Sequence, residues 1–396
     1  MYVAKLDLSW FRSPFMRHSF LVESTDQIDK LHRTGIQHVE IDPTRSCIEV
    51  SQEDRNPSQP PPELKTLAPA GQPKSLVQLT EEITQARIAR KQLEQAVRSM
   101  FSTINQSGTV SPLQAREAVQ EITITARTLT NSAMFMALSQ NRGGDQTLSQ
   151  HALSTCTLSL IIGQTFGFNP LELNELATAA LLHDIGLLQV PLSIQKRSAD
   201  TSHRLTERER DQFHSHPRLS VALLERQKGF DAAMLHLINE HHALLDGSGY
   251  PPETRGEFTS DRTRILAVTD RYDELITGFG GATPLAPHQA LQRVYREAQE
   301  GKLDKDIVSR LIKIVGIYPI HSSVRLNTKE VAVVTQLNPN KLHQPVVTIT
   351  HEAGGSSYPA PFVVNLSQQE GLPPERAIET VLEASFTVEN RPSKAA

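Results

Sequence analysis

The sequence lacks the features of a secreted or membrane-spanning chain. It has two cysteines, Cys47 and Cys156, in 396 residues. Two cysteines do not make a disulfide framework and are typical of a reducing cytosol. The first residues show no charged segment followed by an apolar core, so no signal peptide is predicted. The best apolar run, Leu158–Gly163, is far shorter than a membrane span. We therefore expect a cytoplasmic protein.

A strong charge of either sign is also absent. The 40 basic and 44 acidic residues leave a net charge of -4. That balance gives the whole chain no attraction to nucleic acid or to an anionic membrane, so neither is expected as a partner. The chain is 38% hydrophobic and 21% charged, as is ordinary for globular proteins. Its length allows more than one domain, each with its own core.

The chain divides into four predicted regions. Residues 1–50 are expected to form a small mixed α/β domain, with strands at 20–22 and 38–42 and a helix at 25–32. Residues 51–75 are rich in proline, glutamine and charge. That composition cannot bury enough apolar surface to fold, so it predicts a linker. Residues 76–320 are expected to be helical, and residues 321–396 to be a β-rich tail.

The predicted helical region shows clear periodicity. Ser111, followed by Pro112 and Gln114, has the residue types of a helix N-terminus. Further helices are expected at about 149–166, 171–183, 206–228, 231–242, 261–276 and 287–298. Apolar residues at helical spacing mark one face of the first long helix: Leu93, Val97, Met100, Phe101 and Ile104.

The predicted tail differs in composition from the helices. Residues 323–326, 330–334 and 344–350 are rich in β-branched residues, and Asn-Pro and Gly-Gly pairs separate such runs. The fold class expected for the whole chain is therefore mainly α. A helical bundle would follow a small α/β domain and precede a small β-rich tail.

Imidazole and carboxylate side chains occur at the ends of predicted helices. His183 and Asp184 end one helix, and His241 and His242 end another. These are ligands that divalent transition metals prefer. A lone His-Asp pair arises easily by chance, so the context decides its meaning. Several such residues at separated points indicate a site for more than one ion, and paired metals hydrolyse phosphate esters.

The order of the motifs closely resembles the HD-GYP family, a subgroup of the HD metal-dependent phosphohydrolases, over residues 145–320. A Leu-Thr-x-x-Glu stretch at 205–209 precedes a His-Pro pair at 216–217, and the paired histidines precede Asp-Gly-Ser-Gly-Tyr-Pro at 246–251. His183 and Asp184 are the signature pair, which the resemblance makes catalytic. It also implies a ligand set for two metals: His151, His183, Asp184, His216, His241, His242 and Asp270.

The beginning of the chain carries a second resemblance. Residues 8–15, Leu-Ser-Trp-Phe-Arg-Ser-Pro-Phe, are similar to the uncharacterised N-terminal domain that often precedes HD-GYP modules. The HD-GYP family hydrolyses cyclic di-GMP. The resemblance therefore implies a hydroxide activated by two divalent ions that attacks phosphorus, with pGpG or GMP as product. Fe or Mn is expected first, with Ni or Zn as alternatives.

The family pattern also suggests how substrate and partners are bound. Gly249, Tyr250 and Pro251 lie near the substrate in the family, and this loop is a candidate contact for diguanylate cyclase proteins. Lys196 and Arg264 are the remaining basic residues near the motifs that could contact a phosphate. We take these five residues as substrate-binding candidates.

The chain departs from the family pattern at four places. Leu187 stands where the family has a phosphate-contacting lysine, and Ala243 replaces an acid after the paired histidines. Residues 278–283, Gly-Phe-Gly-Gly-Ala-Thr, replace an arginine-containing segment. Thr147 stands where some members have a glutamate for a third metal, so two ions are expected. The metal ligands are thus retained while the substrate contacts are reduced.

These departures leave three functions open. The first is a metal-dependent cyclic di-GMP phosphodiesterase. The second is a degenerate module that senses a nucleotide or binds a protein, and the third is a phosphohydrolase for another cyclic dinucleotide. Structural interpretations also exist. His183 and Asp184 could interact with a helix end and cap a turn, while His151 or His216 alone could be a surface histidine.

Overall fold

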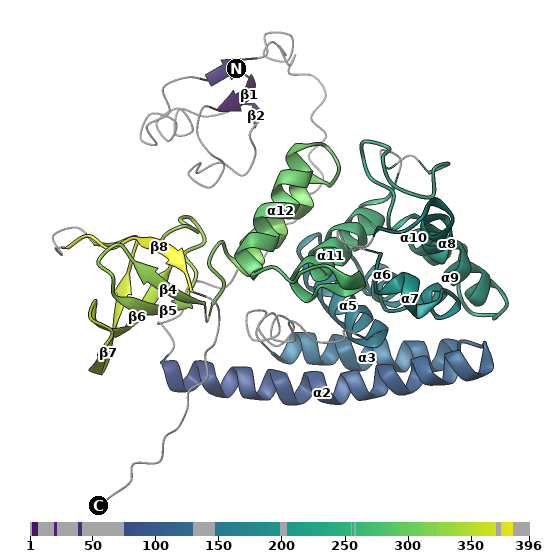
Figure 1. Cartoon of the computed structure of the whole chain (residues 1–396), viewed down its shortest axis with the longest axis horizontal. Helices are drawn as coiled ribbons and strands as arrows, with labels where there is room; N and C mark the ends of the chain where they lie inside the picture. The colour runs from purple at the N-terminus through teal and green to yellow at the C-terminus, as the bar shows by residue number, and fades with distance from the viewer. Residues whose placement is uncertain are drawn as a thin grey trace, which may run out of the picture. The chain divides into compact units, whose positions relative to one another are not determined.

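The computed structural model describes residues 2–6, 20–21, 39–41, 75–129, 147–198, 204–254, 256, 259–320, 322–369 and 374–382. The chain divides into two compact units. One contains the helices between residues 75 and 321, and the other contains the strands that precede and follow them in sequence. Figure 1 labels the elements of both units. The predicted fold class, mainly α with a β-rich C-terminal part, is confirmed.

The helical unit contains a succession of helices. Its elements are α2 (Leu76–Ser107), α3 (Pro112–Thr128), α5 (Leu148–Thr165), α6 (Pro170–Leu182), η3 (Ile185–Gln189), α7 (Leu192–Gln195), α8 (Glu207–His214), α9 (His216–Glu225), α10 (Ala232–Glu240), α11 (Asp261–Thr277), η5 (Phe279–Gly281), α12 (Pro287–Gln299) and α13 (Lys305–Val315).

Local sequence signals set several of these boundaries. The hydroxyl of Ser111 accepts a hydrogen bond from the backbone N–H of Gln114, with Pro112 in the first turn, so the predicted start of α3 is confirmed. Thr206 and Glu209 form a capping box at α8. The single helix expected over 206–228 is wrong, because it breaks between α8 and α9. Pro217, in the first turn of α9, has no N–H to continue the earlier helix.

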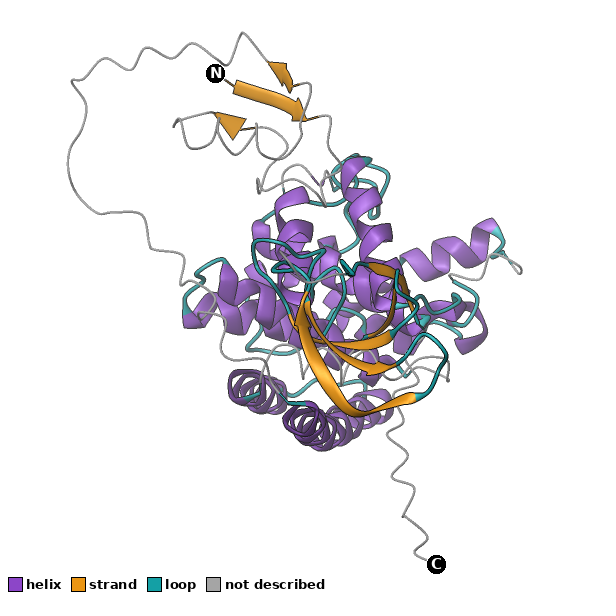
Figure 2. Ribbon diagram, turned by 90° about the vertical axis from the view of Figure 1, so that its left-hand side faces the viewer, coloured by secondary structure: helices purple, strands orange, loops and turns teal. Residues whose placement is uncertain are grey.

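The centre of the helical unit is α5. Every residue from Ser149 to Gly163 except Gln150 is buried, and the helix packs against α6, α11 and α2. α2 and α3 lie side by side, as both Figure 1 and Figure 2 show. The predicted apolar face of α2 is buried as expected. This packing fixes α5, α6 and α11, which carry or adjoin four of the candidate metal ligands described below.

Two small antiparallel sheets form the other unit. The first has the order β2-β1-β3, from β1 (Tyr2–Leu6), β2 (Phe20–Leu21) and β3 (Val39–Ile41). β2 and β3 fall at the predicted strand positions. The helix expected at 25–32 and the linker expected at 51–75 lie outside the described residues, apart from Ser75, which caps α2.

The C-terminal sheet has the order β7-β6-β5-β4-β8 and is curved (Figure 2). Its strands are β4 (Ser323–Leu326), β5 (Val331–Gln336), β6 (Val346–His351), β7 (Ser357–Asn365) and β8 (Ile378–Val381). The first three match predicted strands, and the last two were not predicted. β7 contains Pro359 and Pro361, which a central strand would not accommodate, but β7 lies at the edge of the sheet.

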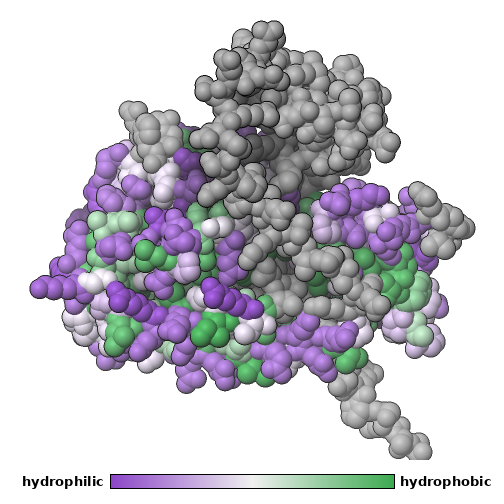
Figure 3. Space-filling model, turned by 180° about the vertical axis from the view of Figure 1, so that it is seen from behind, coloured by the Kyte–Doolittle hydropathy of each residue, from purple (hydrophilic) through white to green (hydrophobic). Residues whose placement is uncertain are grey.

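In the described part of the chain, no helix is both long and apolar enough to cross a membrane. Hydrophilic side chains predominate on the face seen in Figure 3, with smaller apolar patches between them. Exposed apolar side chains on α2 and α3 include Val77, Ile88, Leu113 and Ile124.

Candidate metal centre

The seven predicted metal ligands lie together inside the helical unit. α5 supplies one of them, the turn after α6 two, the start of α9 one, the end of α10 two, and α11 one. Six of the side chains are buried, and that of His242 is 18% exposed. Their donor atoms form overlapping groups within 4.8 Å of one another. The residues are His151, His183, Asp184, His216, His241, His242 and Asp270.

Asp184 lies between two sets of histidines. Its Oδ1 is 3.0 Å from Nε2 of His216 and 3.5 Å from Nε2 of His241. Its Oδ2 is 3.6 Å from Nε2 of His151 and 3.5 Å from Nε2 of His183. Each carboxylate oxygen therefore faces a different pair of imidazoles. This is the arrangement of a carboxylate that bridges two ions.

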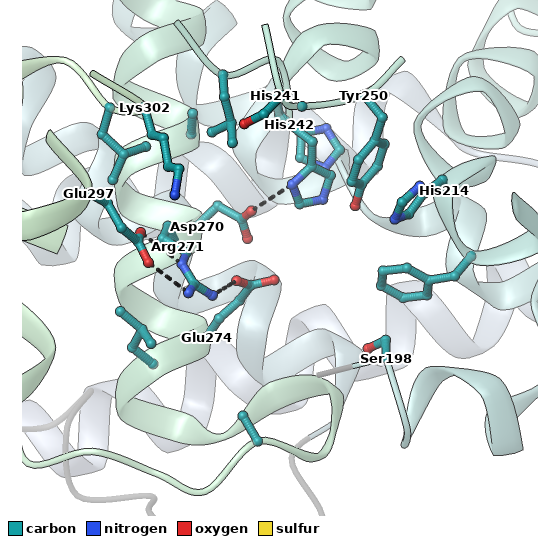
Figure 4. Close-up of a pocket in the computed structure, with 18 of the residues that line it drawn as sticks. Ser198, His214, His241, His242, Tyr250, Asp270, Arg271, Glu274, Glu297 and Lys302 are labelled. Atoms are coloured by element: carbon teal, nitrogen blue, oxygen red, sulfur yellow. Dashed lines mark hydrogen bonds and ion pairs between the residues drawn. The ribbon is translucent and has the colours of Figure 1, made fainter. Parts of the chain in front are cut away.

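Asp270, on α11, faces the pair formed by His151 and His183. Its Oδ1 is 2.9 Å from Nε2 of His151 and 3.4 Å from Nε2 of His183. Its Oδ2 is 3.7 Å from Nδ1 of His242, the pair marked in Figure 4. The first set thus consists of His151, His183 and Asp270, and the second of His216, His241 and His242. Asp184 is shared by both.

Hydrogen bonds to the backbone fix the tautomers of three histidines. In His183, His216 and His241, Nδ1 lies 2.8, 2.8 and 2.6 Å from the carbonyl oxygen three residues earlier. A carbonyl only accepts, so Nδ1 carries the proton in each neutral ring. Nε2 then has a free lone pair that faces the centre. Metal-ligating histidines are usually held in this way.

His151 is held by a side chain that the sequence did not identify. Its Nδ1 donates to Oδ2 of Asp273, at 2.8 Å. Asp273 is fully buried and lies one helical turn after Asp270 on α11, a spacing that could have indicated a shared face. The ring of Phe279 stacks on His151, with centroids 4.2 Å apart and planes at 3°. These contacts fix the position of the imidazole.

The donor atoms fit a pair of cations. Nε2 of His151 and Nε2 of His183 are 3.3 Å apart, as are Nε2 of His216 and Nε2 of His241. Within each pair, the two Nε2 atoms therefore face the same small space. Oδ1 of Asp184 and Oδ1 of Asp270 are buried against these rings, 3.0 Å from Nε2 of His216 and 2.9 Å from Nε2 of His151, respectively. Cations between these atoms would satisfy all of them, and the N/O set suits divalent transition metals.

The protonation states favour metal binding at the carboxylates. Burial opposes ionisation of Asp184, but His183 and His216 outweigh it and hold the pKa of Asp184 well below its usual range. Hydrogen bonds from His151 and His183 likewise overcome burial and lower the pKa of Asp270. Burial, followed by the charge on His241, holds the pKa of His242 well below its usual range, so this ring is neutral.

His151 behaves differently. Burial lowers its pKa, but hydrogen bonds to Asp270 and Asp273 more than reverse that effect and raise the pKa well above its usual value. In the absence of an ion, these two carboxylates therefore hold a proton on the imidazole. An ion that binds at Nε2 must displace that proton.

Two glycines allow the backbone to bring the ligands together. A Cβ on Gly186 would lie 2.2 Å from the carbonyl oxygen of His216, so only glycine permits α9 to approach the His-Asp turn. The hydroxyl of Ser220 bridges the same elements. It accepts from the N–H of Gly186 at 2.8 Å and donates to the carbonyl of His183 at 2.6 Å. A Cβ on Gly249 would lie 2.1 Å from the carbonyl oxygen of His242.

A pocket of about 670 Å³ opens beside the centre. His241, His242 and Asp270 contribute to its lining, together with Gly249 and Tyr250 of the predicted substrate loop (Figure 4). The ring of Tyr250 lies 4.5 Å from that of His242 and stacks on His214, with centroids 4.0 Å apart. His214, which the sequence gave no reason to single out, is therefore part of the pocket wall.

Three predicted substrate-binding residues lie outside this lining. Pro251 is buried, Lys196 is exposed, and Nη1 of Arg264 lies 3.4 Å from Oδ2 of Asp304. The lining instead contains basic residues that sequence analysis did not identify. These are Arg197, Arg204, Arg210, Arg271, Arg293 and Lys302.

The positions that depart from the family pattern have structural roles. Leu187 is 1% exposed and packs with Val190 and Ile194. Ala243 is also buried. The hydroxyl of Thr147 caps α5 by accepting from the N–H of Gln150. Leu187 therefore contributes to the core and presents no charge to the pocket.

Comparison with known proteins defines the class. Residues 144–307 match the family described as HD domain, and residues 1–115 match a domain of unknown function, DUF3391. Over residues 144–307 the chain therefore resembles the HD domain family, and the predicted resemblance to the HD-GYP subgroup is confirmed. The N-terminal resemblance is confirmed too, and that match extends through the expected linker into α3.

Particular relatives are named as phosphodiesterases. The chain is 27% identical over 359 residues to the cyclic di-GMP phosphodiesterase PA4108 of Pseudomonas aeruginosa, covering 89% of this chain and 83% of that one. It is 31% identical over 155 residues to the cyclic di-GMP phosphodiesterase response regulator RpfG of Xanthomonas campestris, which is 39% of each chain. A 3'3'-cGAMP-specific phosphodiesterase 3 of Vibrio cholerae is 35% identical over 100 residues, 25% of this chain and 21% of that one.

One solved structure matches part of the chain. It is that of Bd1817, an HDG"Y"P protein from Bdellovibrio bacteriovorus, at 20% identity and a TM-score of 0.49. The similarity covers 59% of this chain and 72% of that chain.

Proposed function

We propose that this protein is a metal-dependent phosphodiesterase that hydrolyses cyclic di-GMP. The observation that carries the proposal is the position of Asp184, whose two oxygens face separate histidine pairs. A shared carboxylate between two imidazole sets is suited to a binuclear centre, and binuclear centres activate water for attack on phosphate esters. The relatives named as cyclic di-GMP phosphodiesterases supply the substrate.

The two ligand sets would hold one ion each. His151, His183 and Asp270 would bind the first ion, and Asp184 would bind both. His216, His241 and His242 would bind the second. When bound, two divalent ions supply Lewis-acid activation of water and neutralise charge on the phosphate. Fe or Mn is proposed first, with Ni or Zn as alternatives. Two ions are proposed instead of three, because the hydroxyl of Thr147 caps α5.

The protein side chains set the conditions for that chemistry. Asp273 keeps the Nδ1 proton of His151 away from the centre. Tyr250 and His214 form an aromatic wall beside His242, against which part of the substrate can lie. A pocket of about 670 Å³ is within the range that encloses small-molecule ligands. The proposed product is pGpG or GMP.

The proposal is tested by hydrolysis of cyclic di-GMP with purified, metal-loaded protein under anaerobic, reducing conditions. We expect turnover in the wild type and none above background in Asp184→Ala, because that variant loses a ligand of both ions. Asp261→Ala is the matched control, since Asp261 is an exposed carboxylate at the start of α11. Bound metal without turnover would contradict the proposal.

A second candidate function rests on Leu187. Leu187 occupies the position of the family's phosphate-contacting lysine and is buried in an apolar cluster, so it cannot bind phosphate. A protein that retains the metal ligands but binds the nucleotide without cleaving it would be a sensor or an interaction module. Titration showing tight binding of cyclic di-GMP without hydrolysis would favour this function. Contact of the 249–251 loop with diguanylate cyclases stays a prediction, for which a pull-down is the test.

A third candidate keeps the chemistry and changes the substrate. One relative is named as specific for 3'3'-cGAMP, so that cyclic dinucleotide is the natural competitor in a substrate panel. Preference for it over cyclic di-GMP, at equal metal content, would assign the chain to that substrate.

A further inference from the structure

Cations on one side of the pocket are paired with acidic residues. Nη1 of Arg271 lies 3.0 Å from Oε2 of Glu274, and its Nη2 lies 2.9 Å from Oε1 of Glu297. Nε of Arg293 lies 2.8 Å from the same Oε1 of Glu297. Figure 4 shows Arg271 between its two carboxylates. A substrate phosphate would have to replace these ion pairs to use either arginine. This part of the wall is therefore close to neutral.

The α8 side of the pocket is different. Arg204 precedes α8 and Arg210 lies on it, and both line the pocket. Within the described ranges, neither side chain makes an ion pair or a hydrogen bond. The nearby Arg197 does, because it pairs with Glu209. Both unpaired arginines are exposed, so they keep their charge and can bind an anion without breaking an internal contact.

We propose that Arg204 and Arg210 bind the phosphate of the cyclic dinucleotide that is not being cleaved. This inference rests on the proposed function. A cyclic dinucleotide carries two phosphodiester groups in one ring, so one remains away from the metals while the other reacts. That second phosphate needs cations outside the metal centre. The planar guanidinium group of arginine binds phosphate oxygens in pairs.

The same subsite explains how the chain can dispense with a lysine at position 187. Leu187 is buried and cannot reach the pocket with a charge. Arg204 and Arg210 approach the pocket from the segment that follows α7 and from α8, so they supply the positive charge from another element. A charged hydrogen bond contributes about 1.5–3 kcal/mol, which corresponds to about tenfold to a hundredfold in affinity.

Steady-state kinetics of the full-length, metal-loaded chain test this subsite. The variants are Arg204→Ala/Arg210→Ala, Arg204→Lys/Arg210→Lys and, as matched control, Arg208→Ala. Arg208 is an exposed arginine of α8 that does not line the pocket. Each protein is assayed with cyclic di-GMP and with bis(p-nitrophenyl) phosphate, which has a single phosphodiester and so nothing to place in the subsite.

We expect the double alanine variant to raise KM for cyclic di-GMP at least tenfold with little change in kcat. Its rate with bis(p-nitrophenyl) phosphate should stay within twofold of the wild type, and the lysine variant should recover most of the affinity. An unchanged KM in the double alanine variant, or an equal loss with both substrates, would overturn the subsite while leaving the phosphodiesterase activity intact.

Failure of the proposed function gives a different result. If the metal-loaded wild type hydrolyses bis(p-nitrophenyl) phosphate but not cyclic di-GMP, the dinucleotide can be titrated directly onto it. A Kd that rises at least tenfold in the double alanine variant and not in Arg208→Ala would support the subsite without catalysis. A wild type that neither binds nor hydrolyses cyclic di-GMP would overturn both proposals.

Discussion

At the scale of single residues, the metal centre depends on which atom of each imidazole carries its proton. Backbone carbonyls orient three of the rings, and these contacts come automatically with the helix or turn that contains the histidine. His151 lies at the fourth residue of α5, and its Nδ1 does not use a backbone carbonyl. Asp273 takes over this role from another helix. The orientation of His151 therefore depends on tertiary packing.

Replacement of Asp273 by asparagine should weaken binding at the first ligand set. The amide oxygen can still accept from Nδ1, but the negative charge that strengthens the imidazole as a ligand is lost. Such partners typically contribute tenfold to a hundredfold in metal affinity. We expect a loss of that size in Asp273→Asn, measured as metal per chain at buffered free Mn²⁺. Asp261→Asn, an exposed change on the same helix, should bind metal as the wild type does. Equal metal affinity in the two variants would contradict this role.

At the scale of the element, the accuracy of the sequence analysis depended on how local each signal is. The start of α3 follows from Ser111 and its neighbours, so it was predictable. The break before His216 was not predicted, although Pro217 cannot continue the hydrogen bonding of the preceding helix. β7 was missed because its two prolines are tolerated only at a sheet edge, and edge position is a property of the assembled sheet.

The same distinction applies to the candidate site. The ligand residues were found through short motifs in a fixed order, while their convergence on one centre is a result of packing. Asp273 and the pocket arginines have no motif, and they come into view only when α8 and α11 are placed in space. Lys196 and Arg264 were chosen for closeness in sequence to the motifs, which does not imply that they face the pocket.

The C-terminal sheet contains an ion pair that makes its stability depend on pH. Glu330 is 6% exposed and accepts from Nε of Arg376 at 2.7 Å. The hydrogen bond from Arg376 lowers the pKa of Glu330 from its ordinary value of 4.5. A depressed pKa in the folded state contributes stability above the unfolded value, and this contribution is lost as pH falls through the folded value.

Hydrogen exchange of β4 and β5 should therefore accelerate, after correction for the intrinsic rate, as pH falls from 6 through the region of about 4 and below. Amides of Glu330→Gln should exchange faster than those of the wild type at pH 6, which corresponds to a loss of about 1–2 kcal/mol in the free energy of opening. Their exchange should also depend less on pH. Glu379→Gln is the control, because its pair with Lys329 is exposed and such pairs contribute little. An identical pH profile in Glu330→Gln and the wild type would show that the ion pair of Glu330 and Arg376 is not the cause of the pH dependence.

At the scale of the whole molecule, the metal centre joins elements that are distant in sequence. Its candidate ligands come from α5, the turn after α6, α9, α10 and α11. Without ions, the centre places two buried carboxylates close to several buried imidazole nitrogens. Bound ions would both relieve that arrangement and hold the helices together, so metal occupancy and the stability of the helical unit should be linked.

Chelation should therefore lower the Tm of the helical unit. An ion that binds only the folded chain, at a free concentration a hundred times its Kd, adds about 2.7 kcal/mol to the free energy of unfolding. We expect a fall of several degrees when metal is removed with a chelator, and recovery when Mn²⁺ is returned. Asp184→Ala should show a much smaller shift, because both ligand sets lose a member. A Tm that is the same with and without metal in the wild type would count against a binuclear centre.

The two ligand sets also differ in how much of the polypeptide each requires. Asp184, His216, His241 and His242 all precede α11, whereas the other set needs both His151 on α5 and Asp270 on α11. During synthesis from the N-terminus, every residue of the second set is added to the chain before Asp270. The first set is complete in sequence only after α11 has been made. A chain truncated before α11 would therefore contain all the residues of one set but could not assemble the pair.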